Sequence, residues 1–287
     1  IAMSAIDIAL WDIRGKEENQ PISELLGGRQ RDRIRAYATM NLIMSSALSA
    51  DTFEKELRNL MDQGFKAIKL SIDSFGHRDD SRSESAWDLC ETTLLGSART
   101  IVGDNTELML DVWGSDPDWT PDFGWAAKTA KVLEELDYLW FEEPLTPDAL
   151  DDYARLTQQS NIAIAGGEDL ILAKDFEKLS RLKALNIVQP DCTRVGGLSA
   201  MQSIRSAAAQ YNINLIPHGW NTAVGLAADL QLQATMADDT FCMVEVMPHS
   251  SITDLLKHNP FALDDEGMIT VPTGAGLGIT LKDGIGP

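Results

Sequence analysis

The sequence predicts an α/β fold in which parallel strands and helices alternate and close into a barrel. Eight apolar, strand-like runs recur along the chain: Ile34–Leu42, Ala67–Ile72, Leu108–Val112, Tyr138–Phe141, Ile162–Ala165, Asn186–Val188, Asn214–Pro217 and Met243–Val246. Amphipathic segments lie between them, including Thr52–Asp62, Ala126–Leu136, Ala173–Leu182 and Leu198–Ala209. This alternation is typical of a parallel sheet with helical crossovers, and eight repeats of it favour closure into a barrel.

An open, doubly wound sheet is the alternative arrangement of the same elements. It is disfavoured because no glycine-rich phosphate loop follows the first strand and because polar residues recur at the strand ends. Outside the alternation, Ser4–Arg14 is predicted to form an amphipathic helix that leads into Pro21–Gly28. Pro248–Pro287 is predicted to be irregular, with a short strand at Met268–Val271, and Ser74–Ser85 to be a loop.

Composition excludes several classes of partner. The 287 residues are enough for one large barrel domain or two ordinary ones, and 44% of them are hydrophobic, which allows a substantial core. Their net charge of −20 repels nucleic acid and anionic lipid. No apolar run approaches the roughly 18 residues of a membrane span. Three scattered cysteines (Cys90, Cys192 and Cys242) favour neither a disulfide framework nor a zinc site. We therefore expect a cytoplasmic protein that binds neither nucleic acid nor membrane.

Six polar residues stand at or just beyond predicted strand ends, each about one βα unit after the last: Asp111, Glu142, Glu168, Asp191, His218 and Glu245. In a closed barrel such residues converge on one mouth, where barrel enzymes place their active sites. A single charged residue at a strand end has an ordinary explanation, because a solvated loop begins there. Six in register are harder to explain in that way.

The first three of these residues predict a metal site. Asp111, Glu142 and Glu168 end adjacent strands, so their carboxylates can meet around one cation. Three oxygen ligands suit a hard ion, Mg²⁺ first and Mn²⁺ next. Zinc is the weaker alternative because the trio contains no histidine.

Asp191 and His218 end the next two strands, and the carboxylate can orient the imidazole for proton transfer. The alternative is a packed histidine with an acid nearby by chance. Gly219 directly after His218 exposes the ring and favours catalysis.

A lysine ends the second predicted strand. Strand alternation places Lys69 and Ser71 on one face, opposite Lys66. Lys69 there can pair with a substrate carboxylate, although an exposed strand-end lysine is the ordinary alternative.

These motifs, in this order, resemble the enolase superfamily and, within it, the mandelate racemase subgroup. The matching strings are Ala67-Ile68-Lys69, Leu110-Asp111, Trp140-Phe141-Glu142-Glu143-Pro144, Gly167-Glu168, Gln189-Pro190-Asp191 through Arg194-Val195-Gly196-Gly197, and Pro217-His218-Gly219. The resemblance extends from Ser4 to about Gly278. It implies a modified TIM barrel of the (β/α)7β type and a Lys or His base acting with Mg²⁺ on an enediolate.

The resemblance also implies roles, with metal ligands at Asp111, Glu142 and Glu168 and catalytic residues at Lys69, Asp191, His218 and Glu245. Two positions depart from the family pattern. Ser71 stands where a second lysine is usual, and Trp113 stands where many relatives carry asparagine. The Trp-Gly-Ser-Asp string that begins at Trp113 is similar to acid-sugar dehydratases.

The resemblance further implies a division into three parts. Residues 1–28 are expected to be a remnant of a capping-domain helix with its linker, 29–250 the barrel, and 251–287 a segment that packs against the cap. We expect a Mg²⁺-dependent hydro-lyase that dehydrates an aldonate or aldarate, a small anionic sugar acid, in a homo-oligomer. The alternatives are a racemase, epimerase or cycloisomerase acting through the same intermediate, or a truncated barrel without activity.

Overall fold

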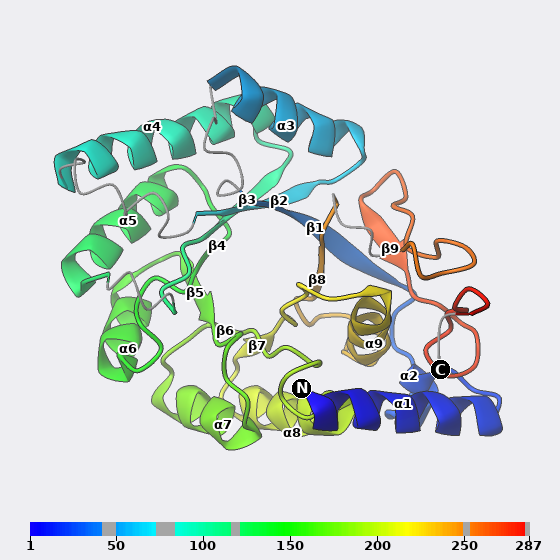
Figure 1. Ribbon diagram of the computed structural model, residues 1–287. Coiled ribbons are helices and arrows are strands. Elements are labelled where there is room, and N and C mark those ends of the chain that lie inside the picture. Colours follow the sequence, from blue (N-terminus) through cyan, green and yellow to red (C-terminus); the bar gives the residue numbers. More distant parts are fainter. Residues whose placement is uncertain (42–49, 73–83, 116–120, 249–252, 285–287) are drawn as a thin grey trace. The chain divides into compact units, whose positions relative to one another are not determined.

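The computed structural model describes residues 1–41, 50–72, 84–115, 121–248 and 253–284 (Figure 1). In chain order its elements are α1 (Ala2–Glu17), α2 (Ile22–Leu25), β1 (Arg33–Asn41), α3 (Ala50–Asp62), β2 (Ala67–Ser71), α4 (Glu84–Val102), β3 (Glu107–Asp111), α5 (Phe123–Glu135), β4 (Trp140–Glu142), α6 (Leu150–Gln159), β5 (Ala163–Gly166), α7 (Ala173–Leu182), β6 (Ile187–Val188), α8 (Gly197–Gln210), β7 (Asn214–Leu215), α9 (Ala223–Gln233), β8 (Met243–Val246) and β9 (Met268–Thr270). Every predicted strand and helix coincides with one of these elements.

Several boundaries differ from the prediction by one to three residues, and the two differences of most interest concern β7 and the loop before α4. β7 ends at Leu215 rather than at Pro217, because proline has no N–H to donate to a strand ladder. The predicted loop Ser74–Ser85 lies outside the described residues except at its last two positions. Those two positions belong to α4, so the predicted loop is too long at its C-terminal end.

The sheet follows the order β7-β6-β5-β4-β3-β2-β1-β8, and β9 pairs antiparallel with β1. The pairs from β1 to β5 are parallel, as expected for strands joined by helical crossovers. Their register sets Ser71 opposite Asp111, Asp111 opposite Glu142, and Glu142 opposite Ala165. The polar ends of β2, β3 and β4 therefore lie at one level.

The chain divides into two compact units. The first comprises Ile1–Tyr37, Gly167–Ser180 and Val188–Pro287, and the second comprises Ala38–Gly166 and Arg181–Ile187. In the second unit, helices α3 to α6 lie outside strands β2 to β5 (Figure 1). The strands are buried on both faces, as their nearly continuous apolar sequences predict.

In the first unit, α1 lies along α8 (Figure 1) and supplies the cap that the first turn of α8 lacks. Asp7 Oδ2 accepts a hydrogen bond from Ser199 N at 3.0 Å, and Ser4 Oγ accepts one from Gly196 N at 2.9 Å. Gly197 has φ +80°, and a Cβ there would lie 2.3 Å from the Asp7 carboxylate. The close approach of α1 to α8 therefore requires glycine at this position.

The apolar side chains that make Ser4–Arg14 amphipathic do not face α8. Ile6, Leu10 and Ile13 are each more than half exposed, whereas Ser4, Ile8 and Gly15 are buried. Polar contacts to α8, rather than the apolar stripe, thus fix the orientation of α1. Within the described part of the chain, no helix has both the length and the apolar character that crossing a membrane requires.

Asp7→Ala is expected to lower the free energy of unfolding by about 1 kcal/mol, because it removes both a helix cap and a negative charge at a helix N-terminus. Urea denaturation measures this change. Glu17→Ala, at an exposed acid of the same helix, is the control and should change stability by less than roughly 0.5 kcal/mol. Equal stability of Asp7→Ala and the control would contradict the capping role.

Candidate active site

Two carboxylates end neighbouring strands of the second unit. Asp111 is the last residue of β3 and Glu142 the last residue of β4, and their Cα atoms are register partners. The two residues are only 2% and 1% exposed. Burial of ionised carboxylates is strongly unfavourable unless they are paired and hydrogen-bonded. The surrounding donors therefore decide whether this pair is stable.

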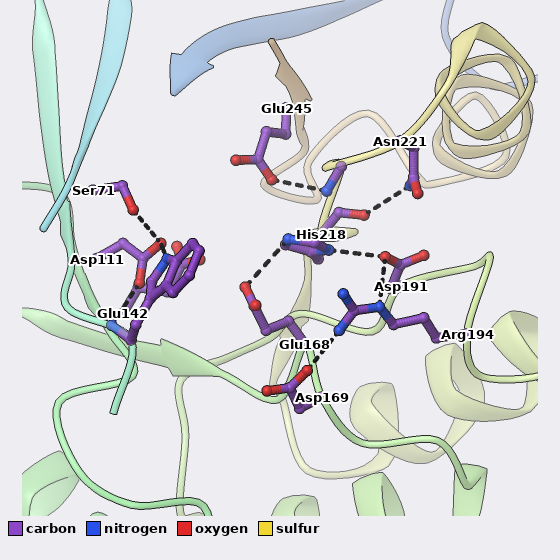
Figure 2. Close-up of polar contacts among 12 residues, drawn as sticks. Ser71, Asp111, Glu142, Glu168, Asp169, Asp191, Arg194, His218, Asn221 and Glu245 are labelled. Carbon is purple, nitrogen blue, oxygen red and sulfur yellow. Dashed lines mark hydrogen bonds and ion pairs between the residues drawn. The ribbon is translucent and has the colours of Figure 1, made fainter. Parts of the chain in front are cut away.

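The two polar side chains of β2 provide donors. Lys69 Nζ lies 2.6 Å from Glu142 Oε1 and 3.5 Å from Asp111 Oδ2. Ser71 Oγ donates to Asp111 Oδ2 at 3.3 Å (Figure 2). Both side chains reach Asp111 and therefore lie on one face of β2, as strand alternation predicted. Lys69 is 1% exposed, so the alternative of an exposed strand-end lysine is wrong.

Two indole groups also bind the carboxylates. The backbone N and the indole Nε1 of Trp113 donate to Asp111 at 3.1 and 3.0 Å, and Trp140 Nε1 donates to Glu142 Oε2 at 2.9 Å. No role of Trp140 was predicted from the sequence. The signal was its position two residues before Glu142 in the same strand, which places both side chains on one face.

The donor set fits a hard divalent cation. Asp111 and Glu142 offer carboxylate oxygens only, which is the chemistry that Mg²⁺ and Mn²⁺ prefer. Glu168 follows the last residue of β5 by two positions. Glu168 offers the same type of ligand atom and is the third ligand that the sequence predicts.

The first unit contains the predicted histidine–aspartate pair. His218 Nδ1 lies 2.9 Å from Asp191 Oδ2, and His218 Nε2 lies 3.2 Å from Glu168 Oε2 (Figure 2). His218 and Asp191 are both buried, in the loops that follow β7 and β6, so the expectation that Gly219 exposes the His218 ring is wrong. The structure therefore brings the imidazole between two acids, one at each ring nitrogen.

Asp191 is fixed from a second side. Thr193 donates to Asp191 Oδ1 twice, from its backbone N at 2.7 Å and from its hydroxyl at 2.6 Å. Burial by itself would raise the pKa of Asp191. The hydrogen bonds and charge of His218 and the hydrogen bonds of Thr193 outweigh that effect and lower the pKa below its ordinary value. Asp191 is thus held as an anion facing His218.

An arginine joins the two loops that carry these acids. Arg194 lies 2.6 Å from Asp169, the neighbour of Glu168, and its Nε lies 3.6 Å from Asp191 Oδ2 (Figure 2). Arg194 belongs to one of the strings that resemble the family, but no role was predicted for it from the sequence.

Glu245, in β8, holds the loop after His218 in place. Its Oε2 accepts a hydrogen bond from Gly219 N at 2.8 Å (Figure 2). A Cβ on Gly219 would lie 2.6 Å from the Cβ of Glu245, so the loop can approach this strand only with glycine. Glu245 thereby positions the segment that carries His218.

Comparison with known proteins identifies the family. Residues 52–285 match the family described as "Enolase C-terminal domain-like", and residues 1–27 match "Mandelate racemase / muconate lactonizing enzyme, N-terminal domain". The chain belongs to the enolase superfamily. Within that superfamily it falls in the mandelate racemase/muconate lactonizing enzyme group.

Curated relatives match nearly the whole chain. D-galactarolactone cycloisomerase of Agrobacterium fabrum is 34% identical, over 98% of this chain and 71% of its own length. Arabinonate dehydratase of Saccharolobus solfataricus is 30% identical, over 99% of this chain and 70% of its own. D-xylonate dehydratase of Haloferax volcanii is 28% identical, over 98% of this chain and 67% of its own length.

Solved structures agree with the fold. The crystal structure of 3,6-anhydro-D-galactonate cycloisomerase from Zobellia galactanivorans superposes with a TM-score of 0.81 at 31% identity, covering 98% of this chain and 73% of its own. The crystal structure of a putative dehydratase from Mesorhizobium loti superposes with a TM-score of 0.82 at 30% identity. The match covers 98% of this chain and 73% of the other. The predicted modified TIM barrel is therefore confirmed. The set Asp111, Glu142 and Glu168 is consistent with the divalent metal site of the enolase superfamily.

Thr193→Val tests the electrostatic support of Asp191. Because the folded-state pKa of Asp191 is depressed, its stabilising contribution is present above the unfolded-state pKa of about 3.9 and is lost as pH falls through the folded-state value. The variant should lose about 1 kcal/mol of unfolding free energy at pH 7, and this loss should shrink toward zero below about pH 4.

Thr157→Val is the matched control, because the Thr157 hydroxyl donates to the uncharged carbonyl of Ala184. Its loss of stability should not depend on pH. Denaturation curves at several pH values compare the two variants. If both lose the same free energy at every pH, Thr193 does not act through the charge of Asp191.

Proposed function

We propose that this enzyme is a divalent-metal-dependent dehydratase of an acid sugar, an aldonate or aldarate. The observation that supports it most is the buried Asp111–Glu142 pair with Lys69, together with the His218–Asp191 pair. Two relatives are named as dehydratases of arabinonate and D-xylonate, which supports the substrate class. The match of residues 1–27 to an N-terminal domain supports the proposal that residues 1–28 are a capping-domain helix and linker.

We assign the metal ion, Mg²⁺ or Mn²⁺, to Asp111, Glu142 and Glu168. When bound, the ion supplies positive charge that stabilises negative charge on the substrate carboxylate. The charges of three carboxylates are then balanced by the ion together with the Lys69 ammonium group. This balance supports a divalent ion, because a monovalent ion would leave a net negative charge in a buried place.

Proton transfer is assigned to His218 Nε2, the ring nitrogen that does not face Asp191. His218 removes the proton α to the substrate carboxylate, and Asp191 keeps the ring oriented and stabilises its protonated form. The enediolate that results carries its added charge on the carboxylate oxygens, where Lys69 donates a hydrogen bond and Glu245 donates one when its carboxyl group is protonated. His218 then returns the proton to the departing β-hydroxyl, which leaves as water.

A single base suits dehydration better than racemisation. Racemisation needs a base on each face of the α-carbon, and the position that would supply the second holds Ser71, which has no basic form near neutral pH. Dehydration needs only one base, because the leaving hydroxyl completes the elimination.

Cycloisomerisation is the second candidate, because the relative with 34% identity is a D-galactarolactone cycloisomerase. Incubation with Mg²⁺ and a panel of acid sugars and sugar lactones separates the two. A 2-keto-3-deoxy acid formed from an open-chain acid sugar supports dehydration. Conversion of a lactone alone, without turnover of any open-chain acid, supports the cycloisomerase.

Glu168→Gln should weaken Mg²⁺ binding severely and abolish turnover, because an amide oxygen carries no charge for the ion. Isothermal titration calorimetry with Mg²⁺ measures the binding. Glu177→Gln, at an exposed acid of α7, should bind Mg²⁺ like the wild type. Unchanged binding in Glu168→Gln would remove this residue from the ligand set.

His218→Asn keeps similar size and some hydrogen bonding but removes the base. The variant should lose both turnover and exchange of the substrate α-proton in D₂O by at least about 10²-fold. Ser71→Ala should keep appreciable exchange. Exchange that survives in His218→Asn, or interconversion of α-epimers by the wild type, would falsify the one-base assignment; NMR of the substrate in D₂O follows both.

A further inference from the structure

The Lys69 side chain contacts both buried carboxylates of the second unit at once. Its Nζ lies 2.6 Å from Glu142 Oε1 and 3.5 Å from Asp111 Oδ2, and the side chain is 1% exposed. Water is therefore not its main partner. A buried ammonium group between two buried carboxylates has the position and the charge of a counter-cation.

The oxygen atoms of Asp111 are close to fully engaged. Oδ1 accepts from Trp113 N, while Oδ2 accepts from the Trp113 indole and from Ser71 and also faces Lys69. An ionised carboxylate has about four lone-pair sites. A metal ion that bound Oδ2 would thus compete with a group already there.

Lys69 is the group most able to leave. Trp113 donates from its own backbone N, two residues after the end of β3, where its φ is +48°, so this donor cannot leave without a change of the chain path. Lys69 is the longest and most flexible of the donors, and its contact with Asp111 is the longest. On Glu142 it occupies Oε1, whereas Trp140 binds the other oxygen, Oε2.

We propose that Lys69 is the internal counter-cation of Asp111 and Glu142, and that a divalent ion displaces its ammonium group from their oxygens. This inference rests on the metal site of the proposed function and deepens it. The displaced ammonium group becomes available to the substrate carboxylate only once the ion is in place. Metal binding thereby controls whether the Lys69 ammonium group can bind the substrate carboxylate.

Lys69→Met removes the competing charge and is tested by calorimetry with Mg²⁺ and by thermal unfolding. Mg²⁺ should bind about tenfold tighter than in the wild type, because no ammonium group has to be displaced. Without added metal the variant should melt roughly 10 °C lower, since two buried carboxylates lose their counter-cation. Lys66→Met, the same change on the opposite face of the strand, is the control and should alter neither quantity appreciably.

Lys69→Arg is the second variant, and it carries the test if Lys69→Met does not fold. Its guanidinium group keeps the charge and can bind both carboxylates through a planar fork, so Mg²⁺ should bind no tighter than in the wild type. Tighter binding by Lys69→Arg, or equal or weaker binding by Lys69→Met, overturns the displacement and leaves the metal site standing. A wild type that binds no Mg²⁺, or binds it equally well after Glu142→Gln, overturns the metal site as well.

Discussion

The burial of Asp111 and Glu142 at the ends of two paired strands is the constraint on which the rest of the site depends. Both residues are almost fully removed from water, and register places their Cα atoms side by side. Two like charges in that position are unstable without cationic and hydrogen-bonding partners. Lysine, hydroxyl and indole donors surround them for that reason, and the negative charge that remains favours a divalent cation.

In the first unit, the support of the His218–Asp191 pair extends to the N-terminal helix. The loop that carries Asp191 runs into α8, whose first turn is capped by Asp7 and Ser4 of α1. On the other side, Glu245 holds the backbone of Gly219 next to His218. Elements far apart in the sequence therefore fix the position of one imidazole, which is what a proton-transfer group requires.

Much of the fold follows from the sequence, because apolar strands and amphipathic helices carry strong periodicity. The placement of Asp111, Glu142, Asp191 and His218 at the ends of strands or just beyond them follows from the same pattern. The hydrogen-bond donors around these residues do not follow from the sequence pattern. Trp140 and Thr193 act through hydrogen bonds whose geometry depends on strand register and loop conformation.

The N-terminal helix illustrates a different limit. Its apolar stripe predicted amphipathicity, yet Asp7 and Ser4 make its hydrogen bonds to the start of α8, while Ile6 and Leu10 are exposed. Periodicity identifies a helix, but the face that it buries depends on its neighbours.

The most direct measurement of the central claim is the location of a bound divalent ion. Crystals grown with Mn²⁺ give an anomalous difference map that identifies the ion without reference to any assumed ligand. The account predicts one strong peak coordinated by carboxylate oxygens of Asp111, Glu142 and Glu168, with Lys69 Nζ moved away from Glu142 Oε1. A peak bound elsewhere, or no peak beside Asp111 and Glu142 at saturating Mn²⁺, would contradict it.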